Sequence, residues 1–155
     1  MNNETDIKFM AKALELAEEA ASKGEVPVGC VIVKDGEIIA EAANSTVGDR
    51  NPLAHAEMKA LNGAIAKIGW RLTDCDMYVT LEPCSMCAGA IVHCRLRRLV
   101  IAARDPKAGA CGSVLNITEN EALNHRLTAE FGVLEAESSS LLKEFFKQVR
   151  DSKKQ

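Results

Sequence analysis

Apolar residues recur every three or four positions from Ile7 to Ala21, with lysine and glutamate between them. This spacing predicts an amphipathic helix. The apolar residues that follow form short runs instead, at 28–33 and 38–43, and these predict two strands. Asp35-Gly36 joins the runs as a hairpin turn, because Asp-Gly tolerates the positive φ that such a turn needs. The first third of the chain therefore predicts a helix followed by a β-hairpin.

Beyond a polar loop at 44–51, the chain alternates between helical and strand patterns. Further helices are predicted at 54–68, 84–94 and 135–154, and further strands at 76–81, 99–103 and 127–134. A long connection rich in Gly, Asn and Asp covers 104–126. Strands separated by helices imply right-handed crossovers with helices on both faces of a sheet. The predicted fold class is α/β, a three-layer α/β/α sandwich with a central five-stranded mixed sheet, as a single domain over residues 1–155.

Composition and the lack of a recognisable targeting segment lead us to expect a protein of a reducing compartment. Hydrophobic residues make up 47% of the 155 positions, which is enough for a core. The first ten residues do not resemble a secretory signal, and no apolar stretch approaches the ~18 residues that a membrane span needs. We therefore expect a cytoplasmic protein without a membrane segment. In that setting, six cysteines indicate metal binding or catalysis rather than disulfides.

Two short segments place metal-binding residue types at the starts of predicted helices. His55 opens one helix, and Cys84 and Cys87 lie in the first turn of the next. Zn²⁺ prefers histidine nitrogen and cysteine sulfur, and the electropositive N-terminus of a helix favours thiolate over thiol. Two helix starts pointing at one spot would supply a three-ligand site from these side chains.

The number of ligands separates a catalytic zinc site from a structural one. Structural sites use four protein ligands, whereas catalytic sites keep three and leave a position for water, whose pKa falls to about 7. Glu57 lies two residues after His55, where a carboxylate can face the open position and exchange protons with that water. The alternative is a structural zinc site, with Cys94, His93 or Cys75 as the fourth ligand.

H-x-E followed 29 residues later by P-C-x-x-C is the known signature of zinc nucleobase deaminases. Nearly the whole chain resembles the zinc-dependent cytidine and deoxycytidylate deaminase family, and within it the bacterial tRNA-specific adenosine deaminases. The matching segments are Glu25–Gly29, His55–Met58, Tyr78–Cys84, Met86–Ala90, Ala103–Lys107, Gly109, Gly112-Ser113, Leu123–Arg126 and Phe145-Phe146. The later segments point to the tRNA branch rather than to the small-nucleoside branches.

The resemblance implies a cytidine-deaminase-like fold, one Zn²⁺ per chain held by His55, Cys84 and Cys87, and Glu57 as a proton shuttle. The implied reaction is hydrolytic deamination of adenosine to inosine at the wobble position of tRNA, with zinc-activated hydroxide attacking C6. The implied partners are a tRNA anticodon stem-loop and a second copy of the chain, with interface residues within 88–90 and 93–104. The implied substrate-binding residues are Asn44, Val28, Val47, Leu81, Asp105, Lys107, Phe146 and Arg150.

Simpler roles compete with three of these assignments. Asn44 could cap or turn its loop, and Asp105-Pro106 could form only a turn. Adjacent residues on a helix point about 100° apart, so one of two neighbouring aromatic side chains can pack while the other faces a groove. We expect Leu142 and Phe145 to pack and Phe146 to lie nearer the RNA.

The net charge of −3 excludes a generally basic surface for nucleic acid, but the charges are segregated. Residues 93–108 carry five basic groups and one acidic group, and residues 141–155 carry five and two. Residues 1–50 carry five basic and ten acidic groups. We expect the two basic segments to form a local positive track for RNA.

Two other function classes stay open at this point. A small-molecule deaminase acting on guanine, cytosine or a nucleotide would share the zinc site but would close its pocket with its own chain. An RNA-binding protein with a purely structural zinc would retain tRNA without chemistry.

Overall fold

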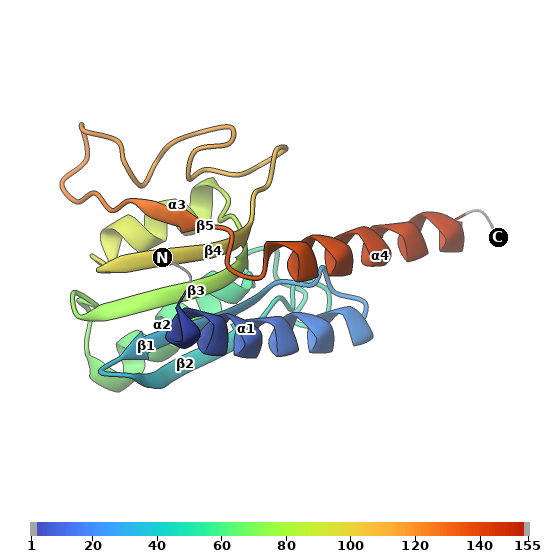
Figure 1. Cartoon of the computed structure of the whole chain (residues 1–155), viewed down its shortest axis with the longest axis horizontal. Coiled ribbons are helices and arrows are strands. Elements are labelled where there is room, and N and C mark those ends of the chain that lie inside the picture. The colour runs from blue at the N-terminus through green and yellow to red at the C-terminus, as the bar shows by residue number, and fades with distance from the viewer. Residues whose placement is uncertain (1–2, 154–155) are drawn as a thin grey trace.

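The structure is a computed structural model that describes residues 3–153 (Figure 1). Within these residues the chain forms four helices and five strands. In chain order they are α1 (Glu4–Ser22), β1 (Gly29–Lys34), β2 (Glu37–Ala43), α2 (Ala56–Ile68), β3 (Cys75–Leu81), α3 (Ser85–His93), β4 (Arg98–Ala103), β5 (Ala129–Phe131) and α4 (Glu135–Lys153). None of the helices in this described range has the length and apolar character needed to cross a membrane.

The five strands form one mixed sheet in the order β2-β1-β3-β4-β5 (Figure 1). β1 pairs antiparallel with both β2 and β3, whereas the β3–β4 and β4–β5 pairs are parallel. Parallel neighbours need a crossover connection, and α3 supplies the one between β3 and β4. The predicted order of elements and the five-stranded mixed sheet are confirmed.

Helices cover both faces of this sheet, and strand periodicity assigns side chains to each face. On β1, Cys30 and Ile32 belong to the core beneath α2 and α3, while Val31 and Val33 belong to the core beneath α1. Successive side chains of a strand point to opposite faces, so a strand covered on both faces is a continuous apolar run. The α1 layer also contains α4, which packs against β4 and α1. The predicted three-layer α/β/α sandwich is confirmed.

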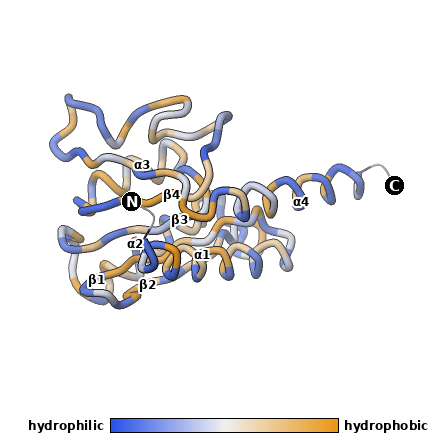
Figure 2. The backbone as a smooth tube through the Cα atoms, viewed as in Figure 1, coloured by the Kyte–Doolittle hydropathy of each residue, from blue (hydrophilic) through white to orange (hydrophobic). Residues whose placement is uncertain are grey.

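Most element boundaries lie within two residues of their predictions, and the larger differences are at α1 and β5. α1 begins at Glu4 rather than Ile7, because the Asn3 side chain caps it by accepting the Asp6 N–H at 2.8 Å. The predicted strand at 127–134 is wrong at both ends, since β5 covers three residues and Gly132 (φ 108°) then turns the chain away. The predicted end of the last helix at residue 154 lies outside the described residues. In Figure 2 the final turns of α4 are mostly hydrophilic, and they project past the other elements.

An ion network connects α1 to three strands. Both oxygens of the buried Asp6 carboxylate accept hydrogen bonds from Arg98 at 2.8 Å, and the Tyr78 hydroxyl donates to Asp6 at 2.6 Å. Arg98 also donates to both oxygens of Glu130, at 2.6 and 2.7 Å. Arg98 is the first residue of β4, so this network anchors the side of the sheet at which β4 begins. We call this side the amino edge.

The opposite ends of the strands form the carboxyl edge, defined by the last residues of β2, β3 and β4. β2 and β3 are both antiparallel to β1, so they run in the same direction and end on the same side of the sheet. The chain passes from β2 through a loop into α2, and from β3 directly into α3. This topology places the starts of α2 and α3 above one edge.

Candidate active site

Three side chains that can ligate a metal meet at the carboxyl edge. His55 is the residue immediately before α2, Cys84 is the residue immediately before α3, and Cys87 lies in the first turn of α3. The Nδ1 atom of His55 is 3.6 Å from the sulfur of Cys84 and 3.6 Å from that of Cys87. All three ligand atoms lie within 4.8 Å of one another.

The cysteine pair has an asymmetric protonation in the metal-free chain. A hydrogen bond from Cys87 and the backbone N–H groups at the start of α3 lower the pKa of Cys84 to about 5. The pKa of Cys87 is raised well above its ordinary value, because its proton is held against Cys84 and because it is buried. One thiolate beside one thiol is an arrangement that a divalent cation stabilises by displacing the remaining proton.

Glu57 lies in the first turn of α2 with its side chain buried beside the three ligands. Burial raises the pKa of this carboxyl to about 7, and its hydrogen bonds and the nearby His55 offset only part of that increase. A carboxyl group with a pKa near neutrality both accepts and donates a proton at physiological pH. Glu57 therefore has the protonation behaviour of a general acid and base.

The donor set fits zinc. One imidazole and two thiols are nitrogen and sulfur ligands of the kind that Zn²⁺ prefers, and both helix N-termini favour the anionic form of the sulfurs. Among residues 3–153 the group has only these three members, and it does not include His93, Cys75 or Cys94. A structural zinc site would need one of these three side chains as its fourth ligand, and none of them belongs to the group. Three protein ligands leave a coordination position for water.

Comparisons with known proteins agree with this geometry. A family model described as MafB19-like deaminase matches residues 3–150. The tRNA-specific adenosine deaminase of Haemophilus influenzae is 47% identical over 156 residues, covering 99% of this chain and 90% of that protein. The chain belongs to the tRNA-specific adenosine deaminase family.

Solved structures place the chain within the wider deaminase group as well. A structure from work on A-to-I editing by tRNA:A34 deaminases at the wobble position superposes with a TM-score of 0.84 at 40% identity, covering 87% of this chain and 99% of that one. A guanine deaminase from Nitrosomonas europaea superposes with a TM-score of 0.78 at 28% identity, covering 90% and 83%. The scaffold is thus shared with deaminases of more than one base.

For this tRNA-specific adenosine deaminase family member, the structure places two of the predicted substrate-binding residues in the loop before α2. The Asn44 side-chain oxygen accepts the Ala56 N–H at 2.8 Å, so Asn44 does serve as a cap for α2. That bond uses the oxygen of the amide and does not involve its two N–H donors. Val47 is 69% exposed in the same loop.

Two other predicted substrate-binding residues, Val28 and Leu81, lie deeper. Val28 is buried in the core beneath α2 and α3, and Leu81 packs against that core at the end of β3. Val28 is therefore a core residue with little exposed surface.

The predicted RNA-contacting residues occupy two separate segments. Asp105 accepts the N–H groups of Lys107 and Ala108 at 3.0 and 3.2 Å, so the predicted turn forms, and the Lys107 side chain is exposed. On α4, Phe146 is 43% exposed and stacks edge-on against the half-buried Phe145. Leu142 is also half-buried, as expected, and Arg150 is exposed near the end of the helix.

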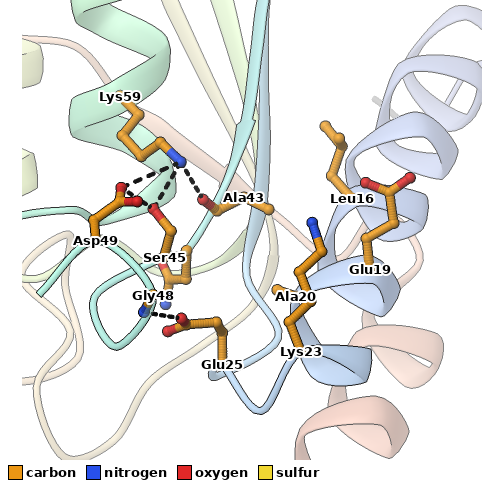
Figure 3. Close-up of a pocket in the computed structure, with 11 residues that line it drawn as sticks. Leu16, Glu19, Ala20, Lys23, Glu25, Ala43, Ser45, Gly48, Asp49 and Lys59 are labelled. Carbon is orange, nitrogen blue, oxygen red and sulfur yellow. Dashed lines mark hydrogen bonds and ion pairs between the residues drawn. The ribbon is translucent and has the colours of Figure 1, made fainter.

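Sequence reasoning missed two buried carboxylates beside these loops. Glu25 accepts the N–H groups of Val47 and Gly48 at 3.1 and 2.7 Å, which fixes the loop that contains Asn44. Figure 3 shows Glu25 bonded to Gly48 and Lys59 bonded to Ser45 on one side, with Leu16 and Glu19 of α1 on the other. The pocket between them has a volume of about 460 Å³. Glu82 is the second carboxylate. Both belong to matched sequence segments, but no residue-type pattern marks the backbone N–H groups that they bind.

Proposed function

We propose that the chain is a single-domain, zinc-dependent enzyme that deaminates adenosine to inosine at the wobble position of tRNA. The observation that supports this most directly is the meeting of His55, Cys84 and Cys87 with the buried Glu57 in a chain 47% identical to a tRNA-specific adenosine deaminase. The absence of a membrane-crossing helix within residues 3–153 fits an enzyme that works on cytoplasmic tRNA.

The chemistry follows from the positions of these side chains. His55, Cys84 and Cys87 would hold zinc, which when bound lowers the pKa of a water molecule at the open coordination position. Glu57 takes a proton from the attacking water and delivers it to N1 of adenine as C6 is attacked. Glu57 then takes the remaining proton from the new C6 hydroxyl and passes it to the amino group, which leaves as ammonia as the C6–N bond breaks and the C6 carbonyl of inosine forms. Its pKa of about 7 suits both transfers.

Recognition of RNA is supported by loops and charges around the carboxyl edge. The target adenine must leave its stack to reach the metal, and a base in an anticodon loop costs less to extrude than a paired base. Asn44 and Val47 lie on one side of this edge, and Asp105 and Lys107 follow β4 on the other. Arg104 and Lys107 of the basic segment 93–108 follow β4 at this edge, whereas Arg97 and Arg98 lie at the amino edge and pair with the carboxylates of Asp76, Asp6 and Glu130. The expected positive track is therefore limited to Arg104, Lys107 and the basic residues of α4, which supply the positive charge that phosphates require.

A homodimer belongs to the same proposal, but its interface must be narrower than the sequence indicated. Residues 99–103 form the interior of β4 and are buried, so they are not available to a second copy. The exposed surface near this region is a groove of about 430 Å³ lined by Gly89, His93, Arg95 and Leu123, among others. We place the dimer contact there.

The deciding experiment incubates the zinc-loaded protein with an in-vitro transcribed tRNA that has adenosine at position 34. Inosine formation at that position supports the proposal. Ammonia release from free guanine or cytosine, with no inosine in tRNA, would instead assign the chain to the small-molecule deaminases. Retention of tRNA without any base conversion would indicate a binding protein.

A further inference from the structure

Glu82 is a buried carboxylate with four hydrogen bonds, all from one segment of chain. It follows β3 directly and is 2% exposed. One oxygen accepts the Asp105 N–H at 3.0 Å and the Ser113 hydroxyl, and the other accepts the N–H groups of Cys111 and Ser113 at 3.0 and 3.1 Å. Burial acts to raise the pKa of Glu82, but these donors outweigh it and the pKa lies below its ordinary value.

The segment from Asp105 to Ser113 wraps closely around this carboxylate. A Cβ atom on Gly109 would lie 2.3 Å from the carboxyl carbon of Glu82 and 2.6 Å from the Asp105 carbonyl oxygen. Glycine is therefore required here by space. The same segment is tied to the residue before Cys84, because the Ala110 N–H donates to the Pro83 carbonyl at 2.8 Å.

These contacts link the metal-ligand group, through Glu82 and Pro83, to the segment 105–113. Glu82 lies two residues before Cys84, and the segment that it holds contains Asp105 and Lys107, the residues that the proposed function places along the RNA. Three of its four donors are backbone or side-chain groups more than 25 positions away in sequence, and a charged acceptor binds such donors about twice as strongly as a neutral one. Residues 104–113 contain no helix and no strand, so contacts such as those with Glu82 hold this segment in place.

We propose that Glu82 is a positioning residue that sets RNA affinity by holding the segment 105–113 in its site-facing conformation. This inference rests on the proposed function. The hydrogen bonds of the Glu82 carboxylate all go to residues 105–113, so it acts through that segment, which contains Asp105 and Lys107. Glutamine has nearly the same shape as glutamate, but it replaces one carboxylate oxygen with an NH₂ group. That group cannot accept the two hydrogen bonds that the lost oxygen accepted.

The experiment compares Glu82→Gln with Ser113→Ala in the full zinc-loaded chain. Ser113→Ala removes one of the four hydrogen bonds and keeps the carboxylate. We expect Glu82→Gln to retain one zinc per chain, to lose at least about tenfold in hydrogen-exchange protection at the amides of residues 105, 111 and 113, and to raise KM for an anticodon stem-loop about tenfold with little change in kcat. Ser113→Ala should show a smaller change of the same kind.

A double-mutant cycle separates positioning from a general structural role. If Glu82 acts through Lys107, the KM effect of Glu82→Gln should shrink when Lys107→Ala is already present. Additive effects, or unchanged exchange at the three amides, would overturn the proposal. If Glu82→Gln does not fold, Gly109→Ala tests the same contact from the other side by displacing the segment. Should the wild-type chain fail to deaminate tRNA, the exchange measurement still decides whether Glu82 holds the segment.

Discussion

Replacing Asp6 with alanine should destabilise the protein far more than breaking an exposed ion pair of similar geometry. The substitution leaves the Tyr78 hydroxyl without its acceptor and removes two of the five hydrogen bonds of Arg98, whose side chain is only 27% exposed. Breaking a buried pair costs about 3–5 kcal/mol, and the value here should lie near 3 because Arg98 keeps Glu130. For a chain of this size that is a fall in Tm of roughly 6–12 °C.

Arg97 supplies the matched control. It also makes two hydrogen bonds to one carboxylate, that of Asp76, at 2.9 and 3.0 Å, but its side chain is 59% exposed. Arg97→Ala should therefore cost less than about 1 kcal/mol. Thermal unfolding of both variants and the wild type, followed by circular dichroism at pH 7 with zinc in excess, gives the comparison. Equal losses from Asp6→Ala and Arg97→Ala would refute the idea that burial makes this network strong.

The same variant has a characteristic pH dependence. Burial acts to raise the pKa of Asp6, but hydrogen bonds from Arg98 and Tyr78 outweigh it and hold the pKa below the ordinary value of 3.8. A carboxyl whose pKa is lower in the folded state adds stability above the unfolded pKa and loses it as the pH falls through the folded value. The difference in unfolding free energy between wild type and Asp6→Ala should thus be constant near neutrality and shrink below about pH 4.

Three further predictions concern the site. Glu57→Gln should bind one zinc by metal analysis yet form inosine about 10²–10⁴-fold more slowly, and a normal rate would remove Glu57 from the proton transfers. In metal-free protein at pH 7, iodoacetamide should alkylate Cys84 rapidly and the fully buried Cys30 slowly, because their pKa values are lowered and raised respectively, and added zinc should protect Cys84. Lys147→Ala and Arg150→Ala should weaken tRNA binding in filter assays without loss of zinc and reduce its salt dependence, and binding that ignores salt would contradict the positive track.

The fold could be predicted because hydrophobic periodicity determines which elements form. The apolar runs at 28–33 and 99–103 correspond to β1 and β4, which are covered on both faces. The prediction failed at β5, where apolar residues continue to Leu134 but the backbone turns at Gly132, and periodicity contains no information about that turn.

The ligand cluster could be predicted for a different reason. Zinc-binding spacing is local in sequence, and both halves of the signature fall at helix starts that the topology places on one edge. The roles of Glu25 and Glu82 could not be predicted, because their partners are backbone N–H groups 22 to 31 residues away. Every residue except proline has such a group, so no residue-type pattern marks it.

The two ends of β4 belong to different parts of the structure. Arg98 begins the strand in the ion network, and Ala103 ends it next to the segment held by Glu82, so the two are roughly 17 Å apart along six residues. Substitutions separated by more than about 7–10 Å usually have additive effects. Substitutions in the loops at the carboxyl edge, which the proposed function assigns to substrate binding, should therefore leave the stability supplied by the ion network at the amino edge unchanged. A single strand thus connects two regions whose sequences can change independently.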